Sequence, residues 1–235
     1  MDLNRRHPGP ELIDDPLVSP DLLREAMDQL HQINRWLRCY QVSVEGVASL
    51  LPPGARQLSV LDVGCGTGES LRAIAAWCRG RGIEFRGTGI ELSEETAAQA
   101  RLACRDLPNL EFRAADLFSL EPEDGAEIVH ASQVLHHFPG DAAARALEQM
   151  YRLAGRGVVV NDLHRHPVAW HGIRLLTAIG SRNPLIRHDA PLSIARGFSA
   201  EELRRLARGA GAEEIRLAWR FPFRWLLVAQ RSPIG

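Results

Sequence analysis

The sequence LDVGCGTG at residues 61–68 constrains the fold of this chain more than any other feature. It overlaps the end of an apolar run, 58–63, that fits a buried parallel strand, and a helical pattern follows it from Glu69. Its glycines permit left-handed backbone and carry no side chains, so bare backbone can approach a bound ligand. The segment therefore predicts a strand, a tight glycine turn and a helix that form one edge of a ligand site.

Apolar runs alternate with helical patterns along most of the 235 residues. The expected strands are 58–63, 85–91, 110–114, 128–132 and 157–162, and the expected helices between them are 69–79, 94–105 and 141–153. Two further strands, 214–219 and 225–230, are expected to close the sheet as an antiparallel hairpin. This order predicts an α/β fold with a doubly wound, seven-stranded, mostly parallel, Rossmann-like sheet.

Helices are expected outside this alternation as well. Ser19 and Pro20 fit the start of an amphipathic helix before the sheet, which suggests an N-terminal helical cap at 1–54 and a ligand-binding domain at 55–235. After the fifth strand the alternation of strand and helix patterns stops for about thirty residues, which is longer than most structureless loops. We expect an inserted helical lid at 163–197.

The composition excludes several kinds of chemistry. All 28 basic residues are arginine, so Schiff-base catalysis and a phosphate-loop lysine are excluded. The four cysteines show no C-x-x-C spacing, and we expect no metal and no disulfide framework. Because no apolar run reaches the roughly 18 residues that span a bilayer and no secretory signal is recognisable, we expect a cytoplasmic protein without a membrane span.

The glycine turn differs from a dinucleotide fingerprint. That fingerprint reads G-x-G-x-x-G, whereas this turn reads G-x-G-x-G with Glu69 at the last position. Asp62 before the turn and Glu69 after it would repel a pyrophosphate, so a ligand with a cationic amine fits better. Glu91, at the end of the second strand, and Asp116, after the third, are carboxylates that can accept hydrogen bonds from the hydroxyl or amino groups of a ligand.

With these motifs in this order, the chain resembles the class I S-adenosylmethionine-dependent methyltransferase family over most of 58–230. The resemblance implies that S-adenosylmethionine is the donor. The implied binding residues are Asp62, Gly64, Cys65, Gly66 and Gly68 of the turn, Glu91 with Leu92 for the ribose, Asp116 with Leu117 for the adenine, and Ser132 near the methionine end. Arg35, in the helix expected before the sheet, is a further candidate for folding over the donor, and a plain packed helix is the alternative.

Histidines supply the candidate bases. Methyl transfer is an in-line displacement that needs positioning and, for a hydroxyl or an acidic carbon, a base. His136 and His137 follow the fourth strand in VLHHF, which resembles a segment of small-molecule methyltransferases where a histidine borders the donor methyl. Asp162 ends the fifth strand and can orient the imidazole of His164, which makes this the second candidate pair. Packing or backbone hydrogen bonding is the alternative role for each pair.

We therefore expect methyl transfer to a small-molecule acceptor, namely a hydroxyl or an acidic carbon of a phenolic, polyketide, quinone or lipid-like secondary metabolite. The expected lid mixes apolar side chains with arginines, and residues 165–235 carry 12 Arg against 5 Asp and Glu. RNA methylation and a non-catalytic S-adenosylmethionine-binding module are the alternatives. Nucleic acid is the less favoured partner, because SQVL after the fourth strand lacks the proline-proline-aromatic signature of base-amine methyltransferases. The acceptor, the methylated atom and the oligomeric state stay open.

Overall fold

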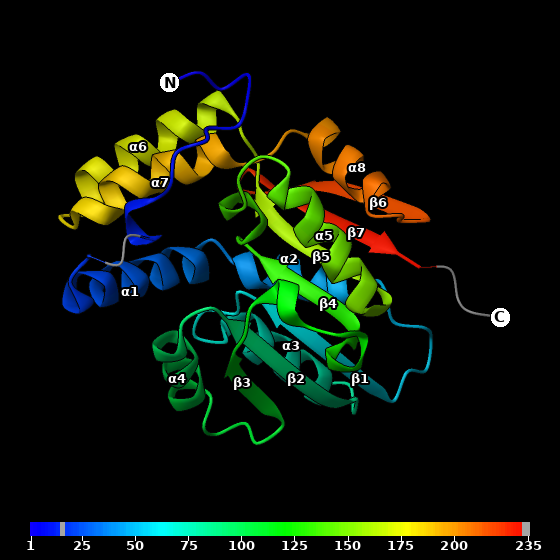
Figure 1. The fold of residues 1–235 in the computed structure, drawn as a ribbon. Helices are drawn as coiled ribbons and strands as arrows, with labels where there is room; N and C mark the ends of the chain where they lie inside the picture. The colour runs from blue at the N-terminus through cyan, green and yellow to red at the C-terminus, as the bar shows by residue number, and fades with distance from the viewer. Residues whose placement is uncertain (15–16, 232–235) are drawn as a thin grey trace.

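The computed structural model describes residues 1–14 and 17–231, and its core is one twisted sheet (Figure 1). The seven strands lie in the order β3-β2-β1-β4-β5-β7-β6. They are β1 (Gln57–Val63), β2 (Glu84–Glu91), β3 (Leu110–Ala114), β4 (Ala126–Ser132), β5 (Ala154–Leu163), β6 (Glu214–Arg220) and β7 (Arg224–Gln230). β1 to β5 are parallel, and β7 runs antiparallel to both of its neighbours, so the predicted fold class is confirmed.

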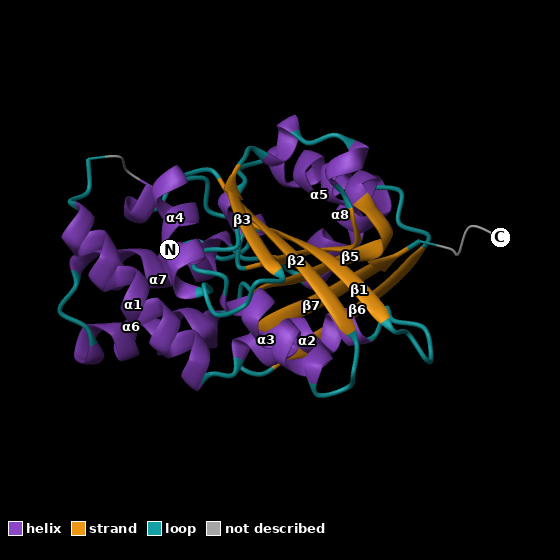
Figure 2. Ribbon diagram, turned by 90° about the horizontal axis from the view of Figure 1, so that it is seen from below, coloured by secondary structure: helices purple, strands orange, loops and turns teal. Residues whose placement is uncertain are grey.

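Helices cover both faces of the sheet (Figure 2). Around the sheet lie α1 (Pro20–Trp36), α2 (Cys39–Ala48), α3 (Glu69–Arg79), α4 (Glu94–Ala103), α5 (Ala142–Leu153), α6 (Pro167–Gly180), α7 (Pro184–Arg196) and α8 (Ala200–Gly209). One apolar core joins the sheet to α5 and α8, and a second joins its other face to α2, α3 and α4. The two cores fix the strand ends from which the functional side chains project.

The residues before β1 pack in two different places. α2 lies on the sheet, where Asn161 of β5 donates its side-chain amide to the Cys39 carbonyl and to the Ser43 hydroxyl at 3.0 and 3.2 Å. α1 packs instead against α7, with Ala26, Leu185 and Ile186 buried between them. α1, α6 and α7 therefore gather beyond one end of the sheet, as Figures 1 and 2 both show.

The lid predicted after β5 consists of α6 and α7. α6 begins at Pro167, four residues after β5 ends, so both helices lie over the carboxyl end of the parallel strands. The N-terminal segment 1–14 runs along this layer, and the backbone amides of Leu12 and Ile13 donate to the Asp189 carboxylate of α7 at 2.9 and 2.8 Å. The ends of the strands are thus enclosed by two parts of the chain that are far apart in sequence.

Candidate active site

The three glycines of the turn serve different purposes. Gly64, Gly66 and Gly68 all have left-handed backbone, with φ of 62°, 55° and 84°. A side chain at Gly64 would meet Val134 at 2.6 Å, and one at Gly68 would meet Phe112 at 2.6 Å, so both must be glycine for packing. A side chain at Gly66 would meet no heavy atom of the described residues within 4 Å. The open space over Gly66 is the cradle that a ligand can enter, and it fits the cofactor that the resemblance implies.

Glu91 lies against this cradle. Because β1 and β2 are neighbouring parallel strands, their carboxyl ends meet, and the backbone amide of Gly66 donates to the Glu91 carboxylate at 2.6 Å. Burial raises the pKa of Glu91, and the charge of Asp62 adds to this effect, whereas the hydrogen bond from Gly66 opposes it. The carboxylate is half-buried, so it can accept hydroxyl hydrogen bonds from a ligand over Gly66.

Asp62 is more deeply placed than Glu91. Its side chain is buried, and one carboxylate oxygen lies 2.6 Å from Nδ1 of the buried His130. The other oxygen, Oδ2, is buried without a hydrogen-bond partner among the described residues. The charge of Asp62 therefore lies beneath the turn, where burial leaves it weakly screened.

The remaining residues that were predicted to bind the donor differ in how exposed their side chains are. Cys65 is buried in the turn, where burial and the charges of Asp62 and Glu91 raise the pKa of its thiol. Leu92 is 79% exposed just after β2, whereas Leu117 is buried. Asp116 is exposed and accepts a hydrogen bond from the Phe118 amide at 3.0 Å.

Ser132 was predicted near the methionine end of the donor, and Arg35 was predicted to fold over the donor. Ser132, at the end of β4, is half-buried and accepts a hydrogen bond from the Asn161 amide at 3.3 Å. Arg35 is exposed on α1. Its neighbour Asn34 faces the sheet and accepts a hydrogen bond from Arg224 at 3.1 Å, while the same guanidinium nitrogen donates to Gln133 at 3.2 Å.

Asp162 pairs with His136. One carboxylate oxygen lies 2.7 Å from Nδ1 of His136, and the other accepts the His136 backbone amide at 3.2 Å. Both side chains are buried. Although burial alone would raise it, the charge and hydrogen bond of His136 hold the pKa of Asp162 below its usual value. The pair fixes the 3₁₀ turn Leu135–His137 that follows β4.

The predicted pairing of Asp162 with His164 is therefore wrong. The His164 ring lies beside Trp225 of β7, with ring centroids 4.6 Å apart, and beside His166 at 5.1 Å. Its Nδ1 is buried without a partner among the described residues, and burial with the charges of His166 and Arg165 lowers its pKa. The 3₁₀ turn after β4 brings His136 to the end of β5, and His164 packs away from it.

His137 lies beside the buried His136 of this pair. Its ring is packed on the His136 ring at 4.4 Å, and its side chain is 32% exposed, against 3% for His136. The charge of His137 lowers the pKa of both Glu91 and Asp162. Among the predicted bases, His137 is thus the more accessible of the two rings on the Leu135–His137 turn.

Glu11 faces both rings, and no sequence pattern predicted this position. Its carboxylate is buried and lies 3.7 Å from Nε2 of His136 and 4.0 Å from Nε2 of His137. Ser193 donates to it at 2.9 Å, and Nε of Arg196 lies 3.8 Å away. Glu11 belongs to a segment with Pro and Gly and no periodic pattern, so its burial was not predictable.

Two arginines tie the N-terminal segment to this turn. Arg6 donates to the carbonyls of His136 and Phe138 at 3.0 and 2.9 Å. Arg196 donates to the carbonyls of Gly9 and His137, both at 2.6 Å. These bonds, together with those to Asp162, hold the backbone of the 3₁₀ turn.

Glu11, His136 and His137 are the described residues whose ligand atoms converge as a metal site would require, within 4.8 Å of one another. Two features disfavour a divalent cation there. The Arg196 guanidinium lies 3.8 Å from the Glu11 carboxylate, and Ser193 already donates to the same oxygen. Neutralisation of Glu11 by Arg196 leaves little charge to offset a dication, so we assign no metal.

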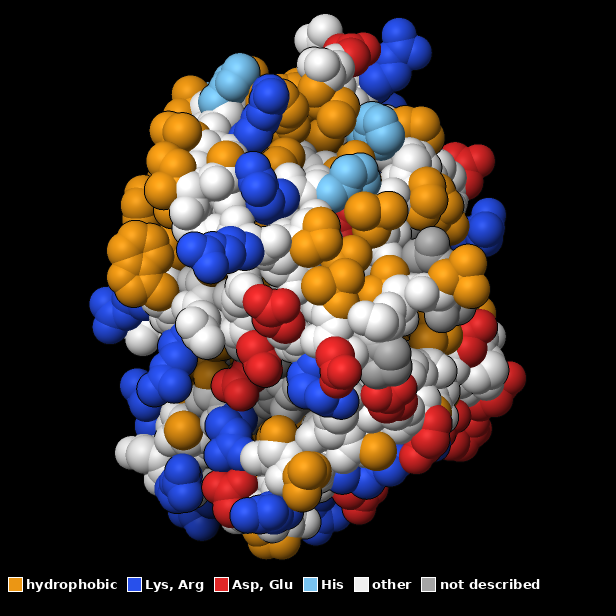
Figure 3. All heavy atoms as spheres, turned by 90° about the vertical axis from the view of Figure 1, so that its left-hand side faces the viewer, with side chains coloured by type: hydrophobic (Ala, Val, Ile, Leu, Met, Phe, Trp, Pro, Cys, Tyr) orange, Lys and Arg blue, Asp and Glu red, His pale blue; other side chains and the backbone are white. Residues whose placement is uncertain are grey.

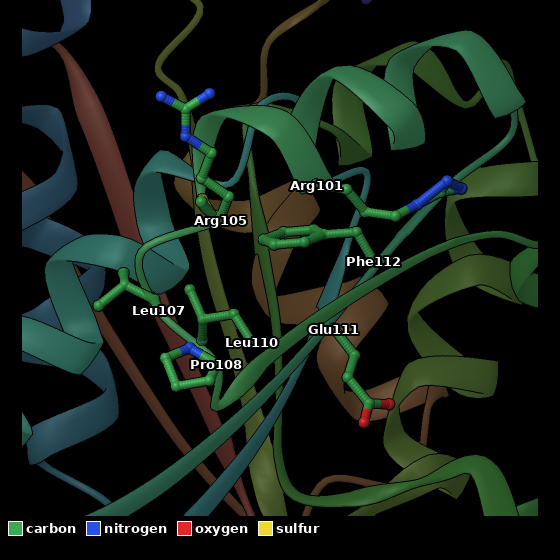
Figure 4. Close-up of a pocket in the computed structure, with 8 residues that line it drawn as sticks. Arg101, Arg105, Leu107, Pro108, Leu110, Glu111 and Phe112 are labelled. Carbon is green, nitrogen blue, oxygen red and sulfur yellow. The ribbon is translucent and has the colours of Figure 1, made fainter.

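A cleft of about 410 Å³ lies away from this chemistry (Figure 4). Its lining includes Arg101 and Arg105 of the α4 region and Leu110 and Phe112 of β3. β3 is an edge strand, and Leu110 is its first residue, so the cleft opens at the outer edge of the sheet. It is separate from the carboxyl ends of β4 and β5, where the histidines lie.

Comparisons with known proteins agree with this geometry. A family model described as "Methyltransferase domain" matches residues 60–157. The 2-methyl-6-phytyl-1,4-hydroquinone methyltransferase of Synechocystis is 29% identical over 147 residues, which are 62% of this chain and 41% of that protein. The trans-aconitate 2-methyltransferase of Methylobacterium nodulans is 35% identical over 91 residues, which are 39% of this chain and 33% of that protein. The chain thus spans less than half the length of these curated relatives.

Solved structures share the whole fold. The plantazolicin methyltransferase BpumL, in complex with SAH, aligns with a TM-score of 0.68 and 16% identity over 91% of both chains. The magnesium protoporphyrin IX methyltransferase of Synechocystis, with bound SAM, aligns with a TM-score of 0.56 and 16% identity over 94% of this chain and 88% of that one. At these identities the likeness to the solved structures shows the fold alone. The methyltransferase domain is shown by the family model. On this evidence residues 60–157 are a methyltransferase domain, and the chain resembles the class I S-adenosylmethionine-dependent methyltransferases in fold and sequence.

Proposed function

We propose that this chain transfers the methyl group of S-adenosylmethionine to an oxygen or an acidic carbon of a small aromatic acceptor, with His137 as the base. The observation that carries the proposal is the place of His137. Its half-buried ring lies on a turn held by Asp162, and Val134, three residues earlier, packs against Gly64 of the glycine turn. A base in this position reaches an acceptor that lies between the cradle and the lid.

In this proposal each residue has a distinct part. When bound, S-adenosylmethionine supplies the methyl group and the positive sulfonium. Glu91 accepts the ribose hydroxyls over Gly66 with Leu92 beside it, Asp116 and Leu117 border the adenine, and Cys65 and Ser132 line the rest of the cradle. Asp62, buried beneath the turn, stabilises the cationic amine through its charge. Arg35 stays a prediction.

His137 takes the acceptor proton as the acceptor atom forms its bond to the methyl group. The electron pair of the breaking sulfur–carbon bond stays on sulfur, so the donor loses its positive charge. Asp162 and His136 are positioning residues, because they hold the backbone of the turn that carries His137. Glu11 faces both rings and stabilises the imidazolium that forms.

Two observations support a small apolar acceptor over a nucleic acid. The lid helices and the N-terminal segment close over the carboxyl ends of the strands, as a pocket for a small molecule requires. Of the arginines in the basic part of the chain, Arg165, Arg196 and Arg224 are buried and bonded within the protein, so they are not part of a nucleic-acid surface. The hydroquinone named for the Synechocystis relative is one acceptor class to test.

Product mass after incubation with labelled donor tests the proposal. The acceptors are hydroquinones, phenols and β-keto acids, with an RNA pool as a separate arm. We expect label in a small molecule and none in RNA. Label in RNA alone would make the RNA alternative correct, and donor binding without transfer to any acceptor would support a non-catalytic module.

His137→Gln tests the base. We expect kcat to fall by about 10²-fold or more while donor affinity is retained, because the base acts on the acceptor proton. His164→Gln is the comparison variant from the second predicted pair. Unchanged turnover in the His137 variant with loss in the His164 variant would move the base to His164.

A further inference from the structure

The outer face of α6 is apolar and exposed. On the inner side of this helix Ala169 and Thr177 are buried. On the opposite side Val168, Leu175 and Ile179 are 61%, 63% and 80% exposed. Their spacing places all three on one face of the helix. Large apolar side chains that gather in this way mark an interaction site, whereas singly scattered ones do not.

The border of this face is cationic. Arg174 of α6, Arg182 after it and Arg187 of α7 are all exposed. The sequence between Arg165 and Arg196 contains one acidic residue, Asp189, and its side chain is buried. Figure 3 views the side of the molecule on which α1, α6 and α7 lie, and there hydrophobic side chains gather along one edge with arginines beside them. A positively charged border around an apolar face fits a negatively charged apolar partner.

A cleft of about 400 Å³ opens between α6, α7 and the N-terminal segment. Arg174, Arg187, Trp170 and His188 are among its lining residues. The Arg174 guanidinium lies 5.2 Å from the centroid of the Trp170 ring, which holds it at the wall of the cleft. Both arginines line the same cleft, and guanidinium groups are common partners of phosphate.

We propose that α6 docks this protein on the surface of an anionic lipid bilayer. Val168, Leu175 and Ile179 enter the boundary between headgroups and acyl chains, and Arg174 and Arg187 bind lipid phosphates in the adjacent cleft. A helix with one apolar face and a cationic border lies in the plane of the interface. Within residues 1–14 and 17–231, no helix is long and apolar enough to cross a bilayer.

Vesicle sedimentation of the full chain tests this inference, and it needs no methyl acceptor. The probes are vesicles of phosphatidylcholine alone and of phosphatidylcholine mixed with phosphatidylglycerol. We expect the wild type to sediment with the mixed vesicles and much less with the neutral ones. Added salt should weaken the binding, because the cationic contribution is screened.

The apolar contribution is measured with Leu175→Ser combined with Ile179→Ser. We expect the partition coefficient to fall about tenfold or more, since each buried aliphatic side chain contributes on this scale. Leu102→Ser on α4 is the matched control, because Leu102 is 65% exposed and Leu175 is 63% exposed. The control should bind vesicles as the wild type does, and circular dichroism confirms that all variants are folded.

The charge contribution is measured with Arg174→Gln combined with Arg187→Gln. We expect binding to mixed vesicles to fall about tenfold, because each arginine near an anionic surface adds several-fold. Arg204→Gln with Arg208→Gln on α8 removes the same charge from another exposed helix. Equal losses in the two arginine pairs would show attraction by net charge without a docking face, which would overturn the proposal.

Two other results would also overturn it. One is a wild type that does not sediment with either kind of vesicle. The other is a dimer in sedimentation velocity that the Leu175→Ser and Ile179→Ser changes convert to a monomer, without vesicle binding by the wild type. That result would assign the outer face of α6 to a second copy of the chain.

Discussion

Gly66→Ala separates a conformational role of the glycine turn from a ligand-binding role. Gly66 has φ of 55°, and an alanine there adopts left-handed backbone at a cost of about 1–2 kcal/mol. The new methyl group meets no heavy atom of the described residues within 4 Å, so no steric cost is added in the free protein. We expect the free energy of unfolding to fall by about 1–2 kcal/mol.

Donor affinity should fall further than this backbone cost explains. The space that the alanine methyl group fills is the space that the proposed donor occupies, so we expect donor binding to weaken by at least about tenfold. Calorimetric titration with S-adenosylhomocysteine measures the affinity, and urea unfolding measures the stability.

Gly82→Ala is the matched control for this experiment. Gly82 also has left-handed backbone, with φ of 67°, and its added methyl group meets no described heavy atom within 4 Å. It lies between α3 and β2, at the opposite end of the sheet from the turn. Both variants should lose similar stability, and only Gly66→Ala should lose affinity. A folded Gly66→Ala protein with wild-type affinity would refute the assignment of this space to the donor.

Two further changes test the carboxylates. Glu91→Gln should weaken donor binding by about 1–3 kcal/mol, since a charged acceptor of hydrogen bonds is lost. Burial raises the pKa of Glu91, so wild-type affinity should fall as the pH drops through that raised value, and titration calorimetry should show no such fall for the glutamine variant. Asp162→Asn should lower the free energy of unfolding by about 3 kcal/mol, because the charged hydrogen bond to His136 is lost. The folded pKa of Asp162 is depressed, so this contribution is present above the unfolded pKa and disappears as the pH falls through the folded one. Urea unfolding across acidic pH should show this loss in the wild type and in an exposed control, Asp141→Asn, but not in Asp162→Asn.

The donor half of the site follows from local sequence and strand order. Glycines at a strand end predict left-handed turns, and two neighbouring parallel strands bring their carboxyl ends together. These two facts place Glu91 beside the turn, as the hydrogen bond from Gly66 confirms. The alternation of apolar runs with helical patterns was sufficient to predict the strands β1 to β7, because turn or helix signals bound each strand in the sequence.

The histidine side of the site depends on contacts that no local pattern encodes. The pairing of Asp162 with His136 arises from a 3₁₀ turn that bends the chain back to β5, whereas sequence proximity favoured His164. α7 gave no clear helical pattern, because Pro191 lies inside it and buried residues occur around most of its circumference. Glu11 is buried beside Ser193 and Arg196 of α7, and Ser193 lies 182 residues away in the sequence.

The bonds from Arg6 and Arg196 to the turn after β4 determine when the site can form during folding. The hydrogen bond from Arg6 to the Arg196 carbonyl joins residues 190 positions apart, and that from Arg196 to Gly9 joins residues 187 apart. Closing loops of this length costs entropy and is favourable only after the sheet between them is compact. A nascent chain that has not yet reached residue 196 contains the residues of the donor cradle. It cannot form the hydrogen bonds from Arg196 to Gly9 and His137. Donor binding should therefore be acquired earlier in synthesis than turnover.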